Sequence, residues 1–128
     1  MEYNNKQTIY QQITDYCLRR ISSGEWNPGE RIPSTRELSL RLGVNSRTII
    51  RAYEELEQMG IIYTQRGFGS FTHADVLSRL AVIRRQEFAA TGLWEFIRMA
   101  REAGFSLPEV IAEIEKQWNN GSDILSSD

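Results

Sequence analysis

The feature that most constrains the fold is a single glycine, Gly43, which separates two helix-forming stretches. Before it, Leu38 and Leu42 are spaced as on one face of a short helix. After it, apolar residues recur at a period of about 3.6: Ile49, Ala52, Tyr53, Leu56 and Met59. Gly43 suits the left-handed conformation that ends a helix, and Asn45 is a favoured N-cap for the next one. Two helices that meet across a turn of about three residues have the spacing of a helix-turn-helix.

Two further elements are predicted before this pair. A helix over residues 7–23 follows from an apolar stripe at helical spacing: Ile9, Ile13, Cys17 and Ile21. A very short strand is predicted at residues 31–32, after a stretch rich in turn-forming residues. Ser34 can then cap a helix over residues 35–42, while the Glu37 side chain reaches back to the backbone N–H of the cap.

A β-hairpin is predicted directly after the second helix of the pair. Residues 61–64 and 70–72 are β-prone, and they flank a glycine-rich tip, residues 65–69, with a cation at Arg66. A hairpin in this place is a wing. We therefore predict a mainly α fold with a small β-hairpin: a winged helix-turn-helix over residues 1–73, followed by a two-helix C-terminal tail.

The tail, residues 74–128, is expected to consist of two helices. The first starts after Asp75 and either continues straight or kinks at Thr91-Gly92. Ser106 opens the last helix with a second capping box, and the last eight residues are expected to be disordered.

The tail also carries more large apolar side chains than two helices can bury against each other. A partner surface is therefore implied, and the simplest partner is a second copy of the chain. We expect six residues to form this dimer interface: Leu80, Ile83, Phe88, Trp94, Ile97 and Ile111.

The net charge of −2 argues at first against a nucleic-acid partner, because binding to phosphates normally needs a basic surface. The charge is unevenly distributed, however. Residues 1–73 hold nine basic and eight acidic side chains, a net charge of +1, and residues 74–128 hold six and nine, a net charge of −3. A locally basic front and an acidic tail suggest separate tasks.

Single residues exclude several kinds of site. Cys17 is the one cysteine and cannot form an internal disulfide, and the single histidine, His73, gives no metal-ligand spacing, so no metal or cofactor is expected. No nucleophile, base and orienting acid recur near each other, which argues against an enzyme. The chain begins without a signal-peptide pattern and has no apolar run of roughly 18 residues, so a cytoplasmic protein without a membrane span is expected.

Three runs of residues strongly resemble the winged-helix domain of the GntR family of bacterial transcription regulators: residues 32–38, 42–45 and 66–71. The similarity extends over residues 8–72, and the short helical tail resembles the YtrA subfamily. The resemblance implies a homodimer that binds a palindromic operator, an inverted repeat in double-stranded DNA, and represses a promoter, often that of a transporter operon. It identifies neither the operator nor an effector molecule.

The same resemblance implies which residues meet DNA. The start of the third helix would enter the major groove, and the tip of the wing would contact the minor groove. An arginine of the second helix would bind the DNA backbone or a guanine. On this chain those roles fall to Arg36, Asn45, Ser46, Arg47, Thr48, Arg66, Gly67 and Gly69. The chemistry agrees, because arginine pairs bidentately with guanine, hydroxyl groups bind phosphate, and glycines let a backbone approach closely.

Two residues keep open roles. Arg51, which we include in the DNA-binding set, either contacts a phosphate or forms a surface ion pair with Glu54 or Glu55. Ile50 stands where many family members carry an arginine, so base preference does not transfer from them. It either contacts a thymine methyl group or closes the edge of the core.

The alternative function is a winged helix that docks a protein instead of DNA. In that case the start of the third helix would be apolar or acidic. It reads Asn-Ser-Arg-Thr, which favours DNA.

Overall fold

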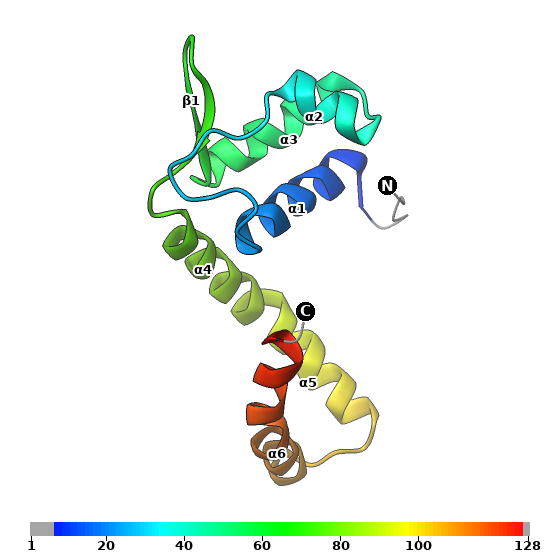
Figure 1. Cartoon of the computed structure of the whole chain (residues 1–128). Helices are drawn as coiled ribbons and strands as arrows, with labels where there is room; N and C mark the ends of the chain where they lie inside the picture. The colour runs from blue at the N-terminus through cyan, green and yellow to red at the C-terminus, as the bar shows by residue number, and fades with distance from the viewer. Residues whose placement is uncertain (1–6, 127–128) are drawn as a thin grey trace. The chain divides into compact units, whose positions relative to one another are not determined.

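The computed structural model describes residues 7–126, with side chains described as far as residue 120. The chain divides into two compact units, residues 1–83 and 84–128. Its elements confirm the expected fold class, a mainly helical winged helix-turn-helix with a two-strand hairpin, followed by C-terminal helices (Figure 1).

Helices and a hairpin make up the first unit: α1 (Ile9–Ser22), α2 (Thr35–Leu42), α3 (Ser46–Gln58), β1 (Ile62–Gln65), β2 (Gly69–Thr72) and the first turns of α4 (Val76–Glu87). α2 has the bounds that the sequence predicts. α1 begins two residues later than expected, because Thr8 caps it. The Thr8 hydroxyl accepts from the Gln11 N–H at 3.3 Å, and the Gln11 carboxamide oxygen accepts from the Thr8 N–H at 3.0 Å.

The turn between α2 and α3 has the expected chemistry. Gly43 has a φ of +64°, and its N–H donates to the Ser39 carbonyl oxygen, which ends α2. Asn45 then caps α3, since its Oδ1 accepts from the Arg47 N–H at 2.9 Å. The two helices therefore meet as a helix-turn-helix.

The core of the first unit lies mainly between α1 and α3. Its buried apolar residues are Ile13, Cys17, Ile21, Trp26, Ile32, Leu38, Ile49, Ala52, Tyr53, Leu56, Ile61, Ile62, Val76 and Leu80. Burial raises the pKa of the Cys17 thiol to about 12, so this cysteine behaves as a small apolar side chain. Burial also raises the pKa of Tyr53, whose hydroxyl donates to the Pro33 carbonyl oxygen at 2.6 Å. That bond ties α3 to the segment that leads into α2.

The hairpin is joined to the helices through the chain segment that precedes α2. The Ile32 N–H donates to the Ser70 carbonyl oxygen at 2.9 Å, and Arg31 forms an antiparallel bridge with Phe71. An isolated bridge thus stands at Arg31, where the sequence predicts a short strand over residues 31–32. The hairpin itself stands out from the helices (Figure 1).

The first unit ends at residue 83, later than the boundary after residue 73 that we expect from the sequence. Val76 is fully buried in its core, Leu80 is only 4% exposed, and Ile83 packs against them. Leu80 is therefore a core residue instead of the dimer contact that we expect, because the apolar face of the first turns of α4 completes the winged helix.

The second unit contains the end of α4, a π-helical turn η1 (Phe88–Gly92), α5 (Leu93–Glu102) and α6 (Leu107–Ser126). At Thr91-Gly92, where the sequence allows either a straight helix or a kink, the helix continues through the π turn. Gly92 suits this turn, because a Cβ there would lie 3.1 Å from the Phe88 ring.

The start of α6 confirms the second capping box. The Ser106 hydroxyl accepts from the Glu109 N–H at 3.3 Å, and the Glu109 carboxylate accepts from the Ser106 N–H at 3.0 Å. Hydrogen bonding of the Glu109 carboxylate with the Ser106 side chain, and then with the Ser106 backbone N–H, lowers the pKa of Glu109. α6 extends to Ser126, into the stretch where we expect disorder, and residues 127–128 lie outside the described residues.

The buried turns of α4 predict how far the first unit can be shortened. A chain that ends at Ala74 lacks Val76 and Leu80, and fully buried aliphatic side chains contribute roughly 1.5–3 kcal/mol each. Its free energy of unfolding should therefore lie several kcal/mol below that of a chain that ends at Arg85. Urea denaturation followed by circular dichroism measures the difference, and equal stability of the two fragments would contradict the role assigned to α4.

Candidate nucleic-acid interface

The start of α3 presents polar and basic side chains beside a buried anchor. Ile49 is buried, whereas Asn45, Ser46 and Arg47 are exposed and Thr48 is half-buried. The cap uses only the side-chain oxygen of Asn45, so its amide N–H groups remain as donors. The helix dipole adds positive potential at this end. The start of α3 can therefore donate hydrogen bonds to phosphates or to base edges.

The beginning of α1 lies next to the start of α3. The Arg51 guanidinium stacks on the Tyr10 ring, with its central carbon 4.0 Å from the ring centroid. An open depression of about 350 Å³ is lined by Thr8, Ile9, Tyr10, Arg47, Thr48 and Arg51. Two helix N-termini and two arginines thus meet at one place on the surface, an arrangement suited to an anion such as a phosphate.

This stacking also bears on the open role of Arg51. Among the ion pairs of the described residues, none joins Arg51 to Glu54 or Glu55. The aromatic ring holds the guanidinium beside the start of α3 instead. Arg51 is therefore placed where a phosphate contact is sterically open, and the surface ion pair is not the arrangement observed.

Arg36 lies exposed in the first turn of α2. The Ser34 hydroxyl caps this helix by accepting from the Glu37 N–H at 3.0 Å, as predicted. The Glu37 carboxylate, however, lies 3.9 Å from Arg31 Nη2 and does not complete the capping box. Arg36 belongs to none of the ion pairs found within residues 7–126, so its charge is not neutralised by a neighbouring acid.

Arg31 is a basic residue that sequence reasoning did not assign to the site. Its side chain lies over Gly69, because a Cβ on that glycine would come within 2.9 Å of Arg31 Nε. Gly69 also has a φ of +111°, which favours glycine. Arg31 therefore sits between the start of α2 and the wing. The predicted strand at residues 31–32, if paired with the predicted hairpin, would have placed an arginine there.

The tip of the wing is narrow and carries a cation. The Phe68 N–H donates to the Gln65 carbonyl oxygen at 2.9 Å, and Gly67 has a φ of +86°. Arg66 is exposed at this turn. The absence of a side chain at Gly67 leaves the backbone of the tip open to close approach.

Ile50 is 42% exposed, directly after the buried Ile49. It therefore does not close the edge of the core, which is one of the two roles left open by the sequence. Its apolar side chain lies on the exposed side of α3, available to an apolar group such as a thymine methyl.

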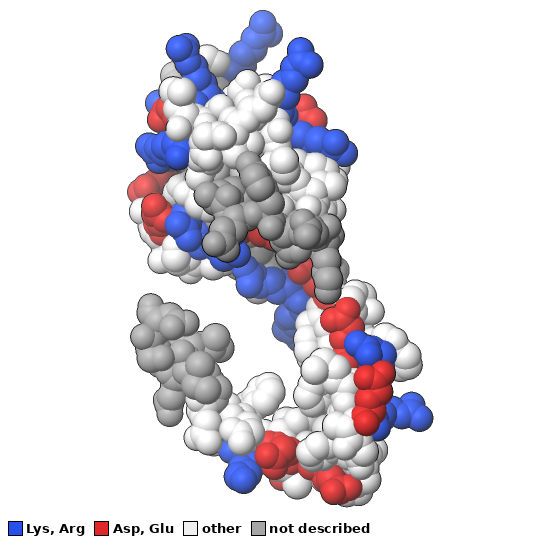
Figure 2. All heavy atoms as spheres, turned by 90° about the vertical axis from the view of Figure 1, so that its right-hand side faces the viewer, with Lys and Arg blue, Asp and Glu red and all other residues white. Residues whose placement is uncertain are grey.

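The basic and acidic side chains are distributed differently over the two units. Residues 1–83 carry ten basic and nine acidic side chains, and residues 84–128 carry five and eight. Figure 2 shows several basic side chains standing out from the end of the first unit from which the hairpin projects. The net charge of the chain thus conceals a basic surface on the winged helix.

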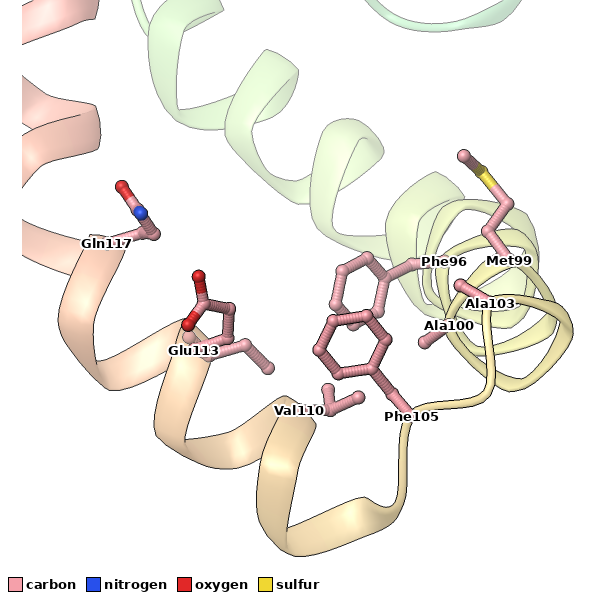
Figure 3. A pocket seen from close by; sticks show the side chains of 9 residues that line it. Phe96, Met99, Ala100, Ala103, Phe105, Val110, Glu113 and Gln117 are labelled. Atoms are coloured by element: carbon pink, nitrogen blue, oxygen red, sulfur yellow. The ribbon is translucent and has the colours of Figure 1, made fainter.

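A second surface lies between α5 and α6 (Figure 3). It is an open groove of about 370 Å³, lined by Phe96, Met99, Ala100, Ala103, Phe105, Val110, Glu113, Ile114 and Gln117. None of the side chains described between residues 84 and 120 is fully buried. Four residues of the predicted dimer interface are among the exposed large apolar ones: Phe88, Trp94, Ile97 and Ile111.

The part of the chain that the structure describes offers no candidate for a metal site or for a membrane-spanning helix. It contains no cluster of three or more His, Cys, Asp or Glu side chains that could hold a metal ion. Within the same residues, no helix is both long and apolar enough to cross a membrane.

Comparison with known proteins agrees with this geometry. Residues 9–72 match the family of bacterial regulatory proteins called gntR. The chain is 31% identical over 122 residues to the uncharacterized HTH-type transcriptional regulator YhcF of Bacillus subtilis (strain 168), spanning 94% of this chain and 98% of YhcF. It is 42% identical over 116 residues to the HTH-type transcriptional repressor YtrA of the same strain, spanning 88% of this chain and 85% of YtrA.

A solved structure extends the likeness to three dimensions. A GntR family transcriptional regulator from Listeria monocytogenes matches with a TM-score of 0.72 at 34% identity, over 89% of this chain and 98% of that one. The matched region includes both the winged helix and the C-terminal helices. This protein is a DNA-binding transcription regulator, not an enzyme: it belongs to the GntR family and is close to the short regulators YtrA and YhcF.

Proposed function

We propose that the protein works as a homodimer that recognises an inverted-repeat operator and represses the adjacent promoter. The observation that carries this proposal is the meeting of Arg47, Arg51 and two helix N-termini at the start of α3. One winged helix touches too few base pairs to select a promoter. Two copies related by a two-fold axis would read half-sites about one helical turn apart.

Within each half-site, the start of α3 would enter the major groove. Arg47 is the residue proposed to read a base, since arginine pairs bidentately with guanine O6 and N7. Asn45, Ser46 and Thr48 would position the helix through phosphates and base edges, and Ile50 would contact a thymine methyl group.

Backbone contacts would surround this base contact. Arg51, held by Tyr10, and Arg36, at the start of α2, are proposed to bind phosphates on the two sides of the major groove. Arg66, with Gly67 and Gly69, would bring the wing to the minor groove. Contacts of this kind add affinity on any sequence.

The second unit is proposed to hold the two copies together. A folded unit normally needs a buried apolar core, and none of the side chains described between residues 84 and 120 is fully buried. A second copy can cover Phe88, Trp94, Ile97 and Ile111, together with the groove between α5 and α6. Its net negative charge would keep this unit away from phosphates.

Repression is the regulatory role that the relatives support. The B. subtilis protein YtrA is named a repressor, and the chain is 42% identical to it. A dimer bound across a promoter would block RNA polymerase in the cytoplasm. By the resemblance to YtrA-type regulators, promoters of transporter operons are the first targets to test.

Selection of bound duplexes from a random pool by the full-length protein tests the proposal as a whole. We expect enrichment of an inverted repeat with a half-site spacing of about one helical turn. Enrichment of no sequence, combined with binding that does not respond to salt, would contradict DNA recognition. It would favour the alternative, a winged helix that docks a protein.

Replacing Arg47 and replacing Arg66 should affect DNA binding in different ways. Arg47→Ala should weaken binding to the selected duplex by about 1–3 kcal/mol and relax the preference at one base pair. Arg66→Ala should weaken binding to all DNA and reduce the salt dependence by about one counterion per half-site. Arg19→Ala, on an exposed position of α1, is the control of equal charge change.

Fluorescence anisotropy titrations at several salt concentrations measure both quantities. A change of base preference with Arg66→Ala but not with Arg47→Ala would reverse the roles of the wing and of the start of α3.

Charges placed on the apolar surface of the second unit should separate the two copies. Trp94→Glu and Ile111→Glu put a carboxylate where an apolar partner is proposed, and a desolvated unpaired charge is strongly unfavourable. Sedimentation equilibrium should show a dimer for the unaltered chain and a monomer for both variants. Gln86→Glu, on an exposed polar position of α4, adds the same charge as a control and should stay dimeric.

The separated variants should also lose the preference for a palindrome over a single half-site. A monomeric unaltered chain, or variants that remain dimeric, would leave the apolar surface to another partner.

A further inference from the structure

The tip of the wing carries an exposed aromatic residue. Phe68 is 67% exposed, beside Arg66 and between two glycines with positive φ. The turn is made by the backbone, through the hydrogen bond from the Phe68 N–H to the Gln65 carbonyl oxygen at 2.9 Å. The aromatic ring has no part in forming that turn.

The fold does not require phenylalanine at this position. Phe68 does not have a positive φ, so other side chains would fit the same backbone. Its ring is absent from the core and from the ring contacts found among the described residues, whereas Tyr63 and Phe71 of the same hairpin stack with centroids 5.6 Å apart. A single exposed apolar residue is ordinary on a protein surface. Its place at the tip of a projecting element, next to a cation, is what gives it a specific use.

We propose that Phe68 inserts as an apolar wedge at a base step in the minor groove and bends the operator. This rests on the proposed function, which brings the wing to that groove. Minor-groove proteins use phenylalanine and similar side chains to unstack a base step in part and bend the duplex toward the major groove. Arg66 would hold the wing on the flanking phosphates, and Gly67, which has no neighbouring atom over it, lets the backbone come close enough for the ring to reach the bases.

The wedge would also read sequence without hydrogen bonds. Pyrimidine–purine steps such as TA and CA unstack most easily, so binding should favour one of them where the wing lands. In a dimer each wing would bend the DNA once, on the two sides of the inverted repeat. Phe68 is thereby a specificity-determining residue at base pairs that make no contact with α3.

The test uses the full-length protein and the duplex enriched by selection, labelled at its two ends for energy transfer. The unaltered protein should shorten the end-to-end distance on binding. Phe68→Ala should lose that shortening and bind at least about fivefold more weakly, because it removes an aromatic side chain that would stack against a base. Phe68→Leu keeps an apolar wedge and should retain most of the bend.

Phe68→Lys is the matched control for affinity alone. The added cation should restore binding to any DNA without restoring the bend, because a lysine at the tip attracts phosphates but does not unstack bases. Replacing the pyrimidine–purine step at the wing by a step that resists unstacking should weaken binding of the unaltered protein several-fold and leave Phe68→Ala unaffected.

Two outcomes overturn the inference while the proposed function stands. The first is a Phe68→Ala variant that bends the duplex as much as the unaltered protein. The second is an altered base step that weakens both proteins equally. If the unaltered protein binds no duplex at all, the proposed function fails together with the inference.

Discussion

The burial of one face of α3 against α1 is the contact on which the rest of the winged helix depends. Ile49, Tyr53 and Leu56 are buried on that face. With Ile49 anchored in the core, the residues just before it are left at the surface, among them Arg47. The Tyr53 hydroxyl reaches the Pro33 carbonyl oxygen and so holds the start of α2 against α3. Packing in the core thereby decides which side chains the protein can offer to DNA.

The two units differ in whether their large apolar side chains are buried within one chain. The first unit completes its core within one molecule, with Val76 and Leu80 of α4 as its last members. The second unit keeps large apolar side chains such as Trp94 at its surface. A partner that covers this surface would couple its own binding to the folding of the second unit, because both processes would bury the same side chains.

Much of the first unit could be predicted from short-range signals. Gly43, Asn45 and Ser34 set the ends of α2 and α3 through contacts that span three to five residues, so the local sequence contains all that they need. The hairpin followed in the same way from its glycines. The boundary of the unit did not, because the fate of Leu80 depends on whether a core formed by residues far away in the sequence has room for it.

The candidate site likewise has some features that follow from consecutive residues and others that depend on tertiary packing. The basic start of α3 and the cation at the wing tip can be read from consecutive residues, whatever the rest of the chain does. The stacking of Arg51 on Tyr10 and the packing of Arg31 over Gly69 join residues about forty positions apart, which come together only when helices and hairpin pack. The sequence by itself determined the helix-turn-helix, the Gly43 and Asn45 signals in its turn, the hairpin and the family, because hydrogen bonds and hydrophobic periodicity within a helix or hairpin are local. The tertiary structure alone decided which apolar side chains are buried in the core and which cations lie beside the start of α3 and the hairpin, because packing is a property of the whole folded chain.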